Sequence, residues 1–181
     1  MGEVYRTSDD SLLLLRNMKG RVSGHVLDMG TGSGILAVAA ALEQDVTRVT
    51  ASDINPEAIK VAEKKAREAG VQGRIEYIVG DLFDAHTGRR YDWILFNPPY
   101  LPSEAGADEN SWAGGRTGSE VILRFLNEAP GYLSSEGSII LIVSSLTDLL
   151  LQKFEEIYYV EVLEELPLFF ERLTCLLLKP L

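Results

Sequence analysis

The sequence predicts an α/β fold, with a mainly parallel sheet and helices on both faces. Short apolar segments alternate with helical segments along most of the 181 residues. Such β-α-β units join parallel strands through helices that cover the sheet. The last two strand segments have no helix between them, which predicts an antiparallel pair at one edge. The length fits a single domain with a sizeable core.

The first predicted helix covers residues 8–17. Ser8 or Asp9 is a suitable N-cap, and residues 12–15 are apolar. The first strand, predicted at 25–29, is short and apolar and leads into a glycine-rich turn.

The next three elements continue the alternation. Residues 33–42 form an alanine-rich helical segment, and residues 46–53 read as a second strand. A helix is predicted from residue 55 to about 69, because Asn55 is a good cap and Pro56 suits the first helical position.

The second half repeats the pattern with one long interruption, a polar loop with glycines. We predict strands at 74–79, 91–96, 138–143, 158–163 and 172–178, helices at 120–128 and 146–156, and the loop at 101–115.

Composition and charge exclude several classes of protein. Hydrophobic residues make up 46% of the chain and the net charge is −10, so there is no general electrostatic footprint for nucleic acid. The single cysteine, Cys175, forms no disulfide within the chain and lies in an apolar run that predicts a buried thiol. His25 and His86 have no cysteine partners, so we expect no metal site. Without a signal pattern or a membrane-length apolar run, a cytoplasmic protein is expected.

The segment Asn97-Pro98-Pro99-Tyr100 follows the buried strand predicted at 91–96. An asparagine amide oxygen accepts hydrogen bonds, prolines fix the backbone, and a tyrosine ring offers a flat surface for stacking. This combination suits a planar substrate that carries an NH2 group, either a carboxamide or an aminopurine. A tight turn with no further role is the alternative interpretation.

A glycine-rich turn follows the first strand, in the stretch from Asp28 to Gly34. Gly30, Gly32 and Gly34 permit a tight turn and a close approach of a ligand to the backbone beside Thr31. The following helix offers free N–H groups and a positive dipole end. The spacing G-x-G-x-G differs from the G-x-G-x-x-G dinucleotide fingerprint. A well-packed strand-helix junction is the alternative.

Acidic residues end the next two strands. Asp53 can accept hydrogen bonds from both ribose hydroxyls of an adenosine ligand, and Ile54 can pack against the adenine. Asp81, followed by Leu82, can read the adenine amino group or begin a turn. Strand ends of an open α/β sheet line one rim, where ligands bind.

These motifs resemble those of the class I methyltransferases that use S-adenosylmethionine. The resemblance implies a seven-stranded Rossmann-like sheet with an antiparallel C-terminal strand, S-adenosylmethionine as cofactor and S-adenosylhomocysteine as product. By this resemblance residues 28–34 are the first motif, Asp53 binds ribose and Asp81 contacts adenine. NAD is the alternative cofactor, but Asn-Pro-Pro-Tyr after the fourth strand argues against it.

Asn-Pro-Pro-Tyr is found in adenine amino-methyltransferases and in glutamine methyltransferases of the HemK type. In both, the resemblance implies that Asn97 and the Pro98 carbonyl accept the two N–H groups of the acceptor, while Tyr100 packs against its plane. The catalytic residues expected are Asn97, Pro98 and Tyr100; the substrate contacts expected are Asn97, Pro99, Tyr100 and Trp112.

Two further stretches are similar to the short archaeal and eukaryotic relatives of HemK. These are residues 111–120, with Trp112 as part of a lid, and residues 4–11, which in the family close over the cofactor. Such relatives methylate the Gly-Gly-Gln loop of class I release factors in translation termination. The cofactor contacts expected are Tyr5, Asp10, Asp28, Gly30, Thr31, Gly32, Gly34, Asp53, Ile54, Asp81, Leu82 and Asn97.

The resemblance also implies a small zinc-binding activator protein that pairs with the third strand, at 74–79. That strand has apolar residues on both faces, so we expect another chain or element to cover its edge; a second copy of the chain or a helix is the alternative to the activator.

We expect one methyltransferase domain over 1–181 with a short helical extension at about 1–22. An adenine amino-methyltransferase and a binder without turnover are the competing functions.

Overall fold

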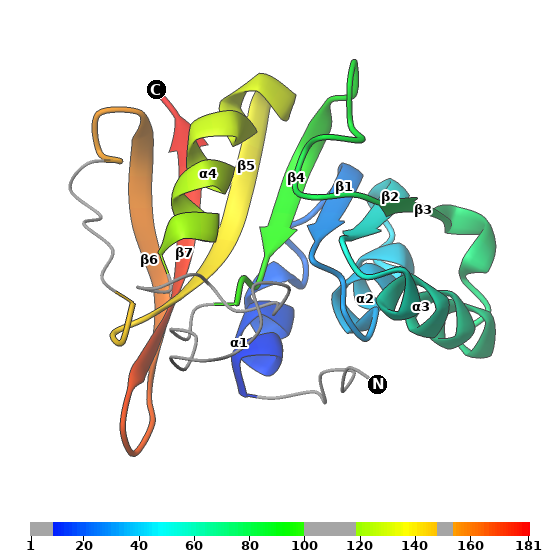
Figure 1. Ribbon diagram of the computed structural model, residues 1–181, viewed down its shortest axis with the longest axis horizontal. Helices are drawn as coiled ribbons and strands as arrows, with labels where there is room; N and C mark the ends of the chain where they lie inside the picture. Colours follow the sequence, from blue (N-terminus) through cyan, green and yellow to red (C-terminus); the bar gives the residue numbers. More distant parts are fainter. Residues whose placement is uncertain (1–8, 100–118, 148–153) are drawn as a thin grey trace.

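Seven strands form one sheet in the order β3-β2-β1-β4-β5-β7-β6 (Figure 1). The computed structural model describes residues 9–99, 119–147 and 154–181. The strands are β1 (Gly24–Met29), β2 (Val46–Asp53), β3 (Ile75–Val79), β4 (Tyr91–Phe96), β5 (Leu133–Ser144), β6 (Tyr158–Pro167) and β7 (Arg172–Pro180). The α-helices are α1 (Asp9–Met18), α2 (Ile35–Leu42), α3 (Pro56–Glu68) and α4 (Glu120–Glu128), with short 3-10 turns at Gln72–Arg74 and Ala129–Tyr132.

The predicted mixture of strand directions is confirmed. Strands β1 to β5 pair in parallel with their neighbours, whereas β7 is antiparallel to both β5 and β6. Along the chain, β1 is followed by β2 on one side, while β4 lies on its other side. The strand order therefore reverses at β1 and β4, which is where open α/β sheets bind ligands.

Helices cover both faces of this sheet, as the sequence predicts. Helices α1, α2 and α3 contact one another in a row. In Figure 1, α4 crosses in front of β5 and β7. Phe96 of β4 packs on Phe125 of α4, with ring centroids 4.4 Å apart, while the next residue, Asn97, bonds to Ser11 of α1. Since neighbouring side chains of an extended chain point to opposite faces, α1 and α4 lie on opposite sides.

The N-terminal helix is part of the main core. Leu13, Leu14 and Met18 of α1 are fully buried, and the helix contacts β5, β6 and β7. Arg16 also forms an ion pair with Glu164 of β6, at 2.5 Å. We therefore propose that α1 and the sheet form one domain over 1–181.

The predicted helix at 146–156 is wrong at both ends. Residues 146–147 and 154–156 lie in turns, and residues 148–153 lie outside the described residues. Strand β5 also begins earlier than predicted, at Leu133, because Gly137 lets it lie against β4. A Cβ atom at Gly137 would lie 2.9 Å from the Tyr91 carbonyl oxygen. Cys175 is buried as predicted, and burial raises its pKa to about 12.

None of the helices in the described ranges is long and apolar enough to span a membrane.

Candidate active site

The site residues predicted from the sequence gather at the carboxyl ends of the parallel strands. The glycine-rich turn follows β1, Asp53 ends β2, Asp81 follows β3, and Asn97 follows β4. In Figure 1 this is the rim toward which the β4 arrow points and beside which α1 lies. The sheet topology thus brings together four segments that are far apart in the sequence.

The turn after β1 depends on glycine backbone geometry. Gly30, Gly32 and Gly34 have φ angles of 64°, 50° and 75°, a region that costs other residues energy. A Cβ atom at Gly34 would lie 2.7 Å from both Cα and Cβ of Ala62 in α3. The predicted tight turn is confirmed, and its last glycine also allows α2 and α3 to pack closely.

Asp28 holds this turn closed. Its Oδ2 accepts hydrogen bonds from the Thr31 hydroxyl, at 2.6 Å, and from the Ala37 N–H, at 2.9 Å. The side chain is fully buried, and its Oδ1 has no partner among the described residues. Burial raises the pKa of Asp28 to about 7, although the two hydrogen bonds oppose the shift.

This raised pKa makes the stability depend on pH. The Asp28 side chain ionises near pH 4 in the unfolded chain but only near pH 7 in the folded protein. Between these values the folded state binds more protons, so a rise in pH lowers the free energy of unfolding. Asp28→Asn keeps the acceptor oxygen without titrating. We expect wild type to lose stability relative to this variant between about pH 4 and pH 7, and to level off above.

Urea denaturation of both proteins at several pH values measures this difference. Parallel stability curves would contradict a raised pKa at Asp28.

Asp53 joins the glycine turn to the start of α3. Its Oδ2 accepts from the Gly32 N–H, at 2.9 Å, and its Oδ1 from the Asn55 N–H, at 2.8 Å. Asn55 caps α3 as predicted, because its side chain accepts from the Glu57 N–H. Burial raises the pKa of Asp53 above its ordinary value. Each carboxylate oxygen can accept a further hydrogen bond, so the pair suits two adjacent hydroxyls. The next side chain, Ile54, is 49% exposed at the same rim.

Asp81 has a partner that the sequence did not predict. Its Oδ2 lies 2.9 Å from Nη2 of Arg124 in α4, in a half-exposed ion pair. The next residue, Leu82, is buried and has a φ of 45°, a strained value for a residue with a side chain. Asp81 is therefore held in place by α4 as well as by its own turn.

Asn97 is oriented by the N-terminal helix. Its Nδ2 donates to the hydroxyl of Ser11, at 3.3 Å, while its Oδ1 is buried with no partner in the described part of the chain. A buried acceptor without a partner is costly. Among the described residues, this geometry therefore leaves one acceptor oxygen available to another group, such as a bound ligand. Pro98 is buried and Pro99 is exposed.

Ser11 is a site residue that the sequence reasoning did not single out. It is buried, and its N–H donates to the carboxylate of Asp10, at 2.5 Å. Asp10 is itself buried at the start of α1. The stretch at 4–11 was the only sequence signal for it. Three predicted site residues, Tyr5, Tyr100 and Trp112, lie outside the described residues.

These side chains fit a ligand built from an adenosine and an amino-acid-like chain. Asp53 offers acceptors for ribose hydroxyls, and the glycine turn allows close approach. Asn97 Oδ1, which has no partner in the described ranges, lies at the same rim. Adjacent hydroxyls, a planar base and an amide donor are the groups that such a surface can bind.

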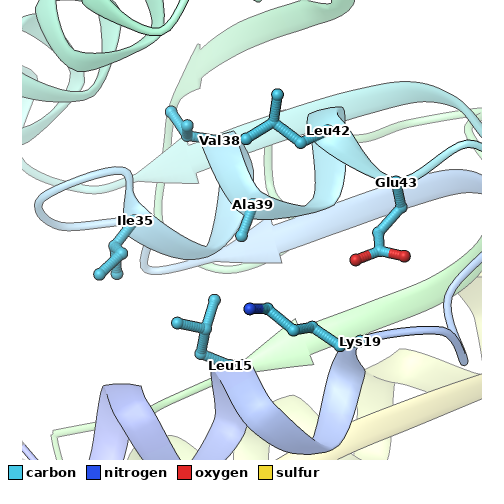
Figure 2. A pocket seen from close by; sticks show the side chains of 7 residues that line it. All are labelled: Leu15, Lys19, Ile35, Val38, Ala39, Leu42 and Glu43. Carbon is cyan, nitrogen blue, oxygen red and sulfur yellow. The ribbon is translucent and has the colours of Figure 1, made fainter.

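A cleft of about 380 Å³ lies elsewhere, between α1 and α2 (Figure 2). Leu15 of α1 and Lys19, which follows the end of α1, face Ile35 and Ala39 of α2 across it. None of the residues that line it is a predicted site residue. The candidate active site is therefore the strand-end rim and not this cleft.

A buried histidine connects β2 and β4 beneath the rim through hydrogen bonds. His86 bonds through Nδ1 to the Tyr91 hydroxyl, at 2.6 Å, and through Nε2 to the Ser52 hydroxyl, at 3.0 Å. Burial lowers its pKa to about 4, so the ring is neutral at physiological pH. Within the described ranges, no three His, Cys, Asp or Glu side chains form a group that could hold a metal ion.

Comparison with known proteins identifies the class. Residues 6–165 match the family model described as the methyltransferase small domain. A structure of M. capricolum TrmK with S-adenosylhomocysteine aligns with a TM-score of 0.68 at 15% identity, over 94% of this chain and 68% of that one. A ribosomal protein L11 methylase from Lactobacillus delbrueckii aligns with a TM-score of 0.63 at 22% identity, over 92% and 75%. The chain belongs to the methyltransferase small domain family, and its fold matches that of a protein solved with S-adenosylhomocysteine.

Curated relatives narrow the assignment of this chain to one class of methyltransferase. A Methanocaldococcus jannaschii protein, provisionally named as a protein N5-glutamine methyltransferase, is 38% identical over 80% of this chain and 74% of its own length. The ribosomal protein uL3 glutamine methyltransferase of Bordetella pertussis is 41% identical over 64% of this chain and 42% of its own length. The release factor glutamine methyltransferase of the same species is 36% identical over 77% and 58%. The chain belongs to the protein-glutamine methyltransferase family, but it spans only about half the length of the two Bordetella relatives.

Proposed function

We propose that the protein transfers a methyl group from S-adenosylmethionine to the side-chain amide nitrogen of a glutamine, in the Gly-Gly-Gln loop of a class I release factor. The observation that carries this proposal is the buried Oδ1 of Asn97 at the reversal point of the sheet, which has no hydrogen-bond partner among the described residues. A glutamine amide has two N–H donors and is planar, so it matches an acceptor fixed in this way.

The chain's own residues act by positioning the amide. Asn97 Oδ1 and the Pro98 carbonyl accept the two N–H groups, which moves electron density toward the nitrogen and fixes its lone pair. When bound, the cofactor would supply an electrophilic methyl group on its sulfonium. The C–S bond would break as the N–C bond forms, leaving S-adenosylhomocysteine, and the methylated amide nitrogen would lose one of its protons to solvent. Positioning and electrostatic stabilisation are the main contributions, so no strong base is needed. Tyr100 and Trp112 complete the acceptor site with Pro99.

The remaining predicted residues hold the cofactor. Asp53 accepts from the ribose hydroxyls, Ile54 packs on the adenine, and Asp81 with Leu82 lies at its edge. The glycine turn, shaped by Asp28 and Thr31, lies against the amino-acid part, and Tyr5 with Asp10 closes over it. In support, the Asp28, Asp53 and Asn97 side chains are each fixed by hydrogen bonds within the described chain.

The choice of acceptor rests on charge and on the relatives. A net charge of −10 opposes binding to a phosphate backbone, so a protein is favoured over the alternative, adenine in RNA or DNA. Among protein substrates, ribosomal protein uL3 is a second candidate. It is favoured because the uL3 glutamine methyltransferase of Bordetella pertussis is 41% identical to this chain. Translation takes place in the cytoplasm, which we propose as the location.

A small zinc-binding activator is a further part of the proposal. Strand β3 is the edge strand predicted for it and pairs with β2 only, among the described strands. Val79 on this strand is 52% exposed. An edge with free backbone groups and an exposed apolar side chain suits an added strand from a partner.

Methyl transfer from labelled S-adenosylmethionine tests the function. Release factor, uL3 and an adenine-rich oligonucleotide are offered in parallel, each with and without the activator. Label on the release factor that is lost when its loop glutamine is changed supports the proposal. Label on uL3 alone or on the oligonucleotide alone assigns the other acceptor.

Asp53→Ala tests the cofactor site. We expect this variant to bind S-adenosylmethionine more weakly by about 1–3 kcal/mol, because two ribose hydroxyls lose their acceptor. Calorimetric titration measures the affinity, and Asp45→Ala, at an exposed aspartate away from the rim, is the matched control. If both variants bind S-adenosylmethionine with equal affinity, Asp53 does not contact the cofactor. Its role would then be limited to the hydrogen bonds that it accepts from Gly32 and Asn55.

A further inference from the structure

The turn between β6 and β7 presents two phenylalanines to solvent. The Leu168 N–H donates to the Glu171 carbonyl, at 2.7 Å, so Phe169 and Phe170 are the two central residues of a tight hairpin turn. They are 93% and 84% exposed, and their rings contact each other edge-on with centroids 4.7 Å apart. Such turns favour Gly, Asn and Asp. Neither the turn nor the core therefore explains two phenylalanines here.

Hydrogen bonds fix this turn to the end of β5. The Ser144 hydroxyl donates to the carboxylate of Glu171, at 2.5 Å. The Ser145 N–H donates to the Arg172 carbonyl, and the Arg172 N–H donates to the Ser145 hydroxyl, both at 2.9 Å. The two rings are therefore carried on a pre-ordered support, which lowers the entropy cost of binding a partner through them.

The turn lies beyond the rim that carries Asn97. Phe96 pairs with Leu141, so Asn97 lies near the level of Ile142 and its partner Cys175. Phe170 is five residues further along, or roughly 16 Å of strand. In Figure 1 this turn projects past the end of the sheet at which β4 and β5 end. A ligand that reaches both Asn97 and the two rings must be a macromolecule.

The charge of the protein indicates which class of macromolecule binds at this turn. Stacking of bases on aromatic rings is used by proteins that also have a positive groove for the backbone. Here the cation next to the turn, Arg172, is paired with Glu165 at 3.4 Å. The whole chain has a net charge of −10. Exposed aromatic side chains without a basic groove are typical of protein-protein contacts.

We propose that Phe169 and Phe170 dock the folded protein that carries the acceptor glutamine. This inference rests on the proposed function and adds a contact remote from the reacting amide. The rings insert into an apolar surface of the substrate protein, while its glutamine loop reaches Asn97. The contact raises affinity for the protein substrate and takes no part in the chemical step.

The double variant Phe169→Ser/Phe170→Ser tests the proposal. Its matched control is Tyr159→Ser/Leu181→Ser, which removes two exposed apolar side chains at the opposite end of the same strand pair. Methyl transfer to a folded class I release factor gives KM and kcat for each protein, in the presence of the activator. We expect KM for the release factor to rise about tenfold or more in the first variant only, the effect of losing an interface anchor. The kcat and the calorimetric affinity for S-adenosylmethionine stay at wild-type values.

Three results would overturn the proposal. An unchanged KM, or a fall in kcat together with cofactor affinity, would show that the turn does not dock the substrate. A wild-type dimer, seen by light scattering, that dissociates in the double variant would assign the rings to a contact between copies. If the wild-type protein transfers no label to the release factor, the release factor is not the acceptor. The proposed function is then wrong, and the release factor is not the docking partner either.

Discussion

Asn97→Ala is expected to lower the kcat of methyl transfer by about 100- to 1,000-fold, the range for removing one preorganised polar contact at a reacting group. The variant loses the buried Oδ1, which has no other partner in the described residues. The glutamine nitrogen then keeps its lone pair delocalised and is no longer held in line with the methyl group. Binding of S-adenosylmethionine stays close to wild type, because Asn97 is only one of the expected cofactor contacts and Asp53 and the glycine turn are untouched.

Single-turnover transfer and calorimetric titration measure the two effects separately. Asn127→Ala is the matched control, since Asn127 is an exposed asparagine on α4. Loss of cofactor affinity in Asn97→Ala, with the control unaffected, would contradict a role in the chemical step. Ser11→Ala should lower kcat by less, because it frees the Asn97 amide to rotate but leaves its oxygen present.

The parts of the site that the sequence predicted are local features. The glycine turn, Asp53 at the end of β2 and the Asn55 cap each depend on residues that are neighbours in the chain. A strand followed by a turn and a helix start can be recognised from such neighbours. Parallel strand order then places these ends on one rim, so the fold class and the rim could both be predicted.

The missed contacts join residues that are far apart in the sequence. Ser11 and Asn97 are 86 residues apart, and Asp81 and Arg124 are 43 apart. Spacing patterns carry no information on which face of α4 meets the end of β3, or on how α1 lies over β4. These pairs decide how Asn97 and Asp81 point, so the orientation of the predicted residues needed the folded structure.

The errors in secondary structure have the same origin. Residues 134–136 are polar and precede Gly137, which favours a loop, yet they belong to β5. Pairing of Leu133 with Tyr91 of β4 extends the strand in spite of this local preference. The leucine-rich segment at 146–156 has an apolar pattern that favours a helix, but its described ends form turns that lead out of β5 and into β6.

Gly34→Ala is expected to have the largest effect on stability. The substitution puts a side chain at a φ of 75°, which costs about 1–2 kcal/mol. It also places Cβ 2.7 Å from the backbone of Ala62, and overpacking of this kind costs about 1–3 kcal/mol more. We therefore expect the free energy of unfolding, measured by urea denaturation, to fall by about 2–5 kcal/mol.

Gly20→Ala separates these two causes. Gly20 has a similar φ of 67°, but a Cβ atom there meets nothing within 4 Å, so only the backbone cost of about 1–2 kcal/mol applies. The excess loss in Gly34→Ala then measures the close packing of α2 on α3. Relief of that contact moves α3, whose first residues follow Asp53, so cofactor affinity should fall in Gly34→Ala and not in Gly20→Ala. Equal losses of unfolding free energy in the two variants would mean that the contact between α2 and α3 adjusts without strain. Gly34 would then be required only for the backbone conformation of the turn.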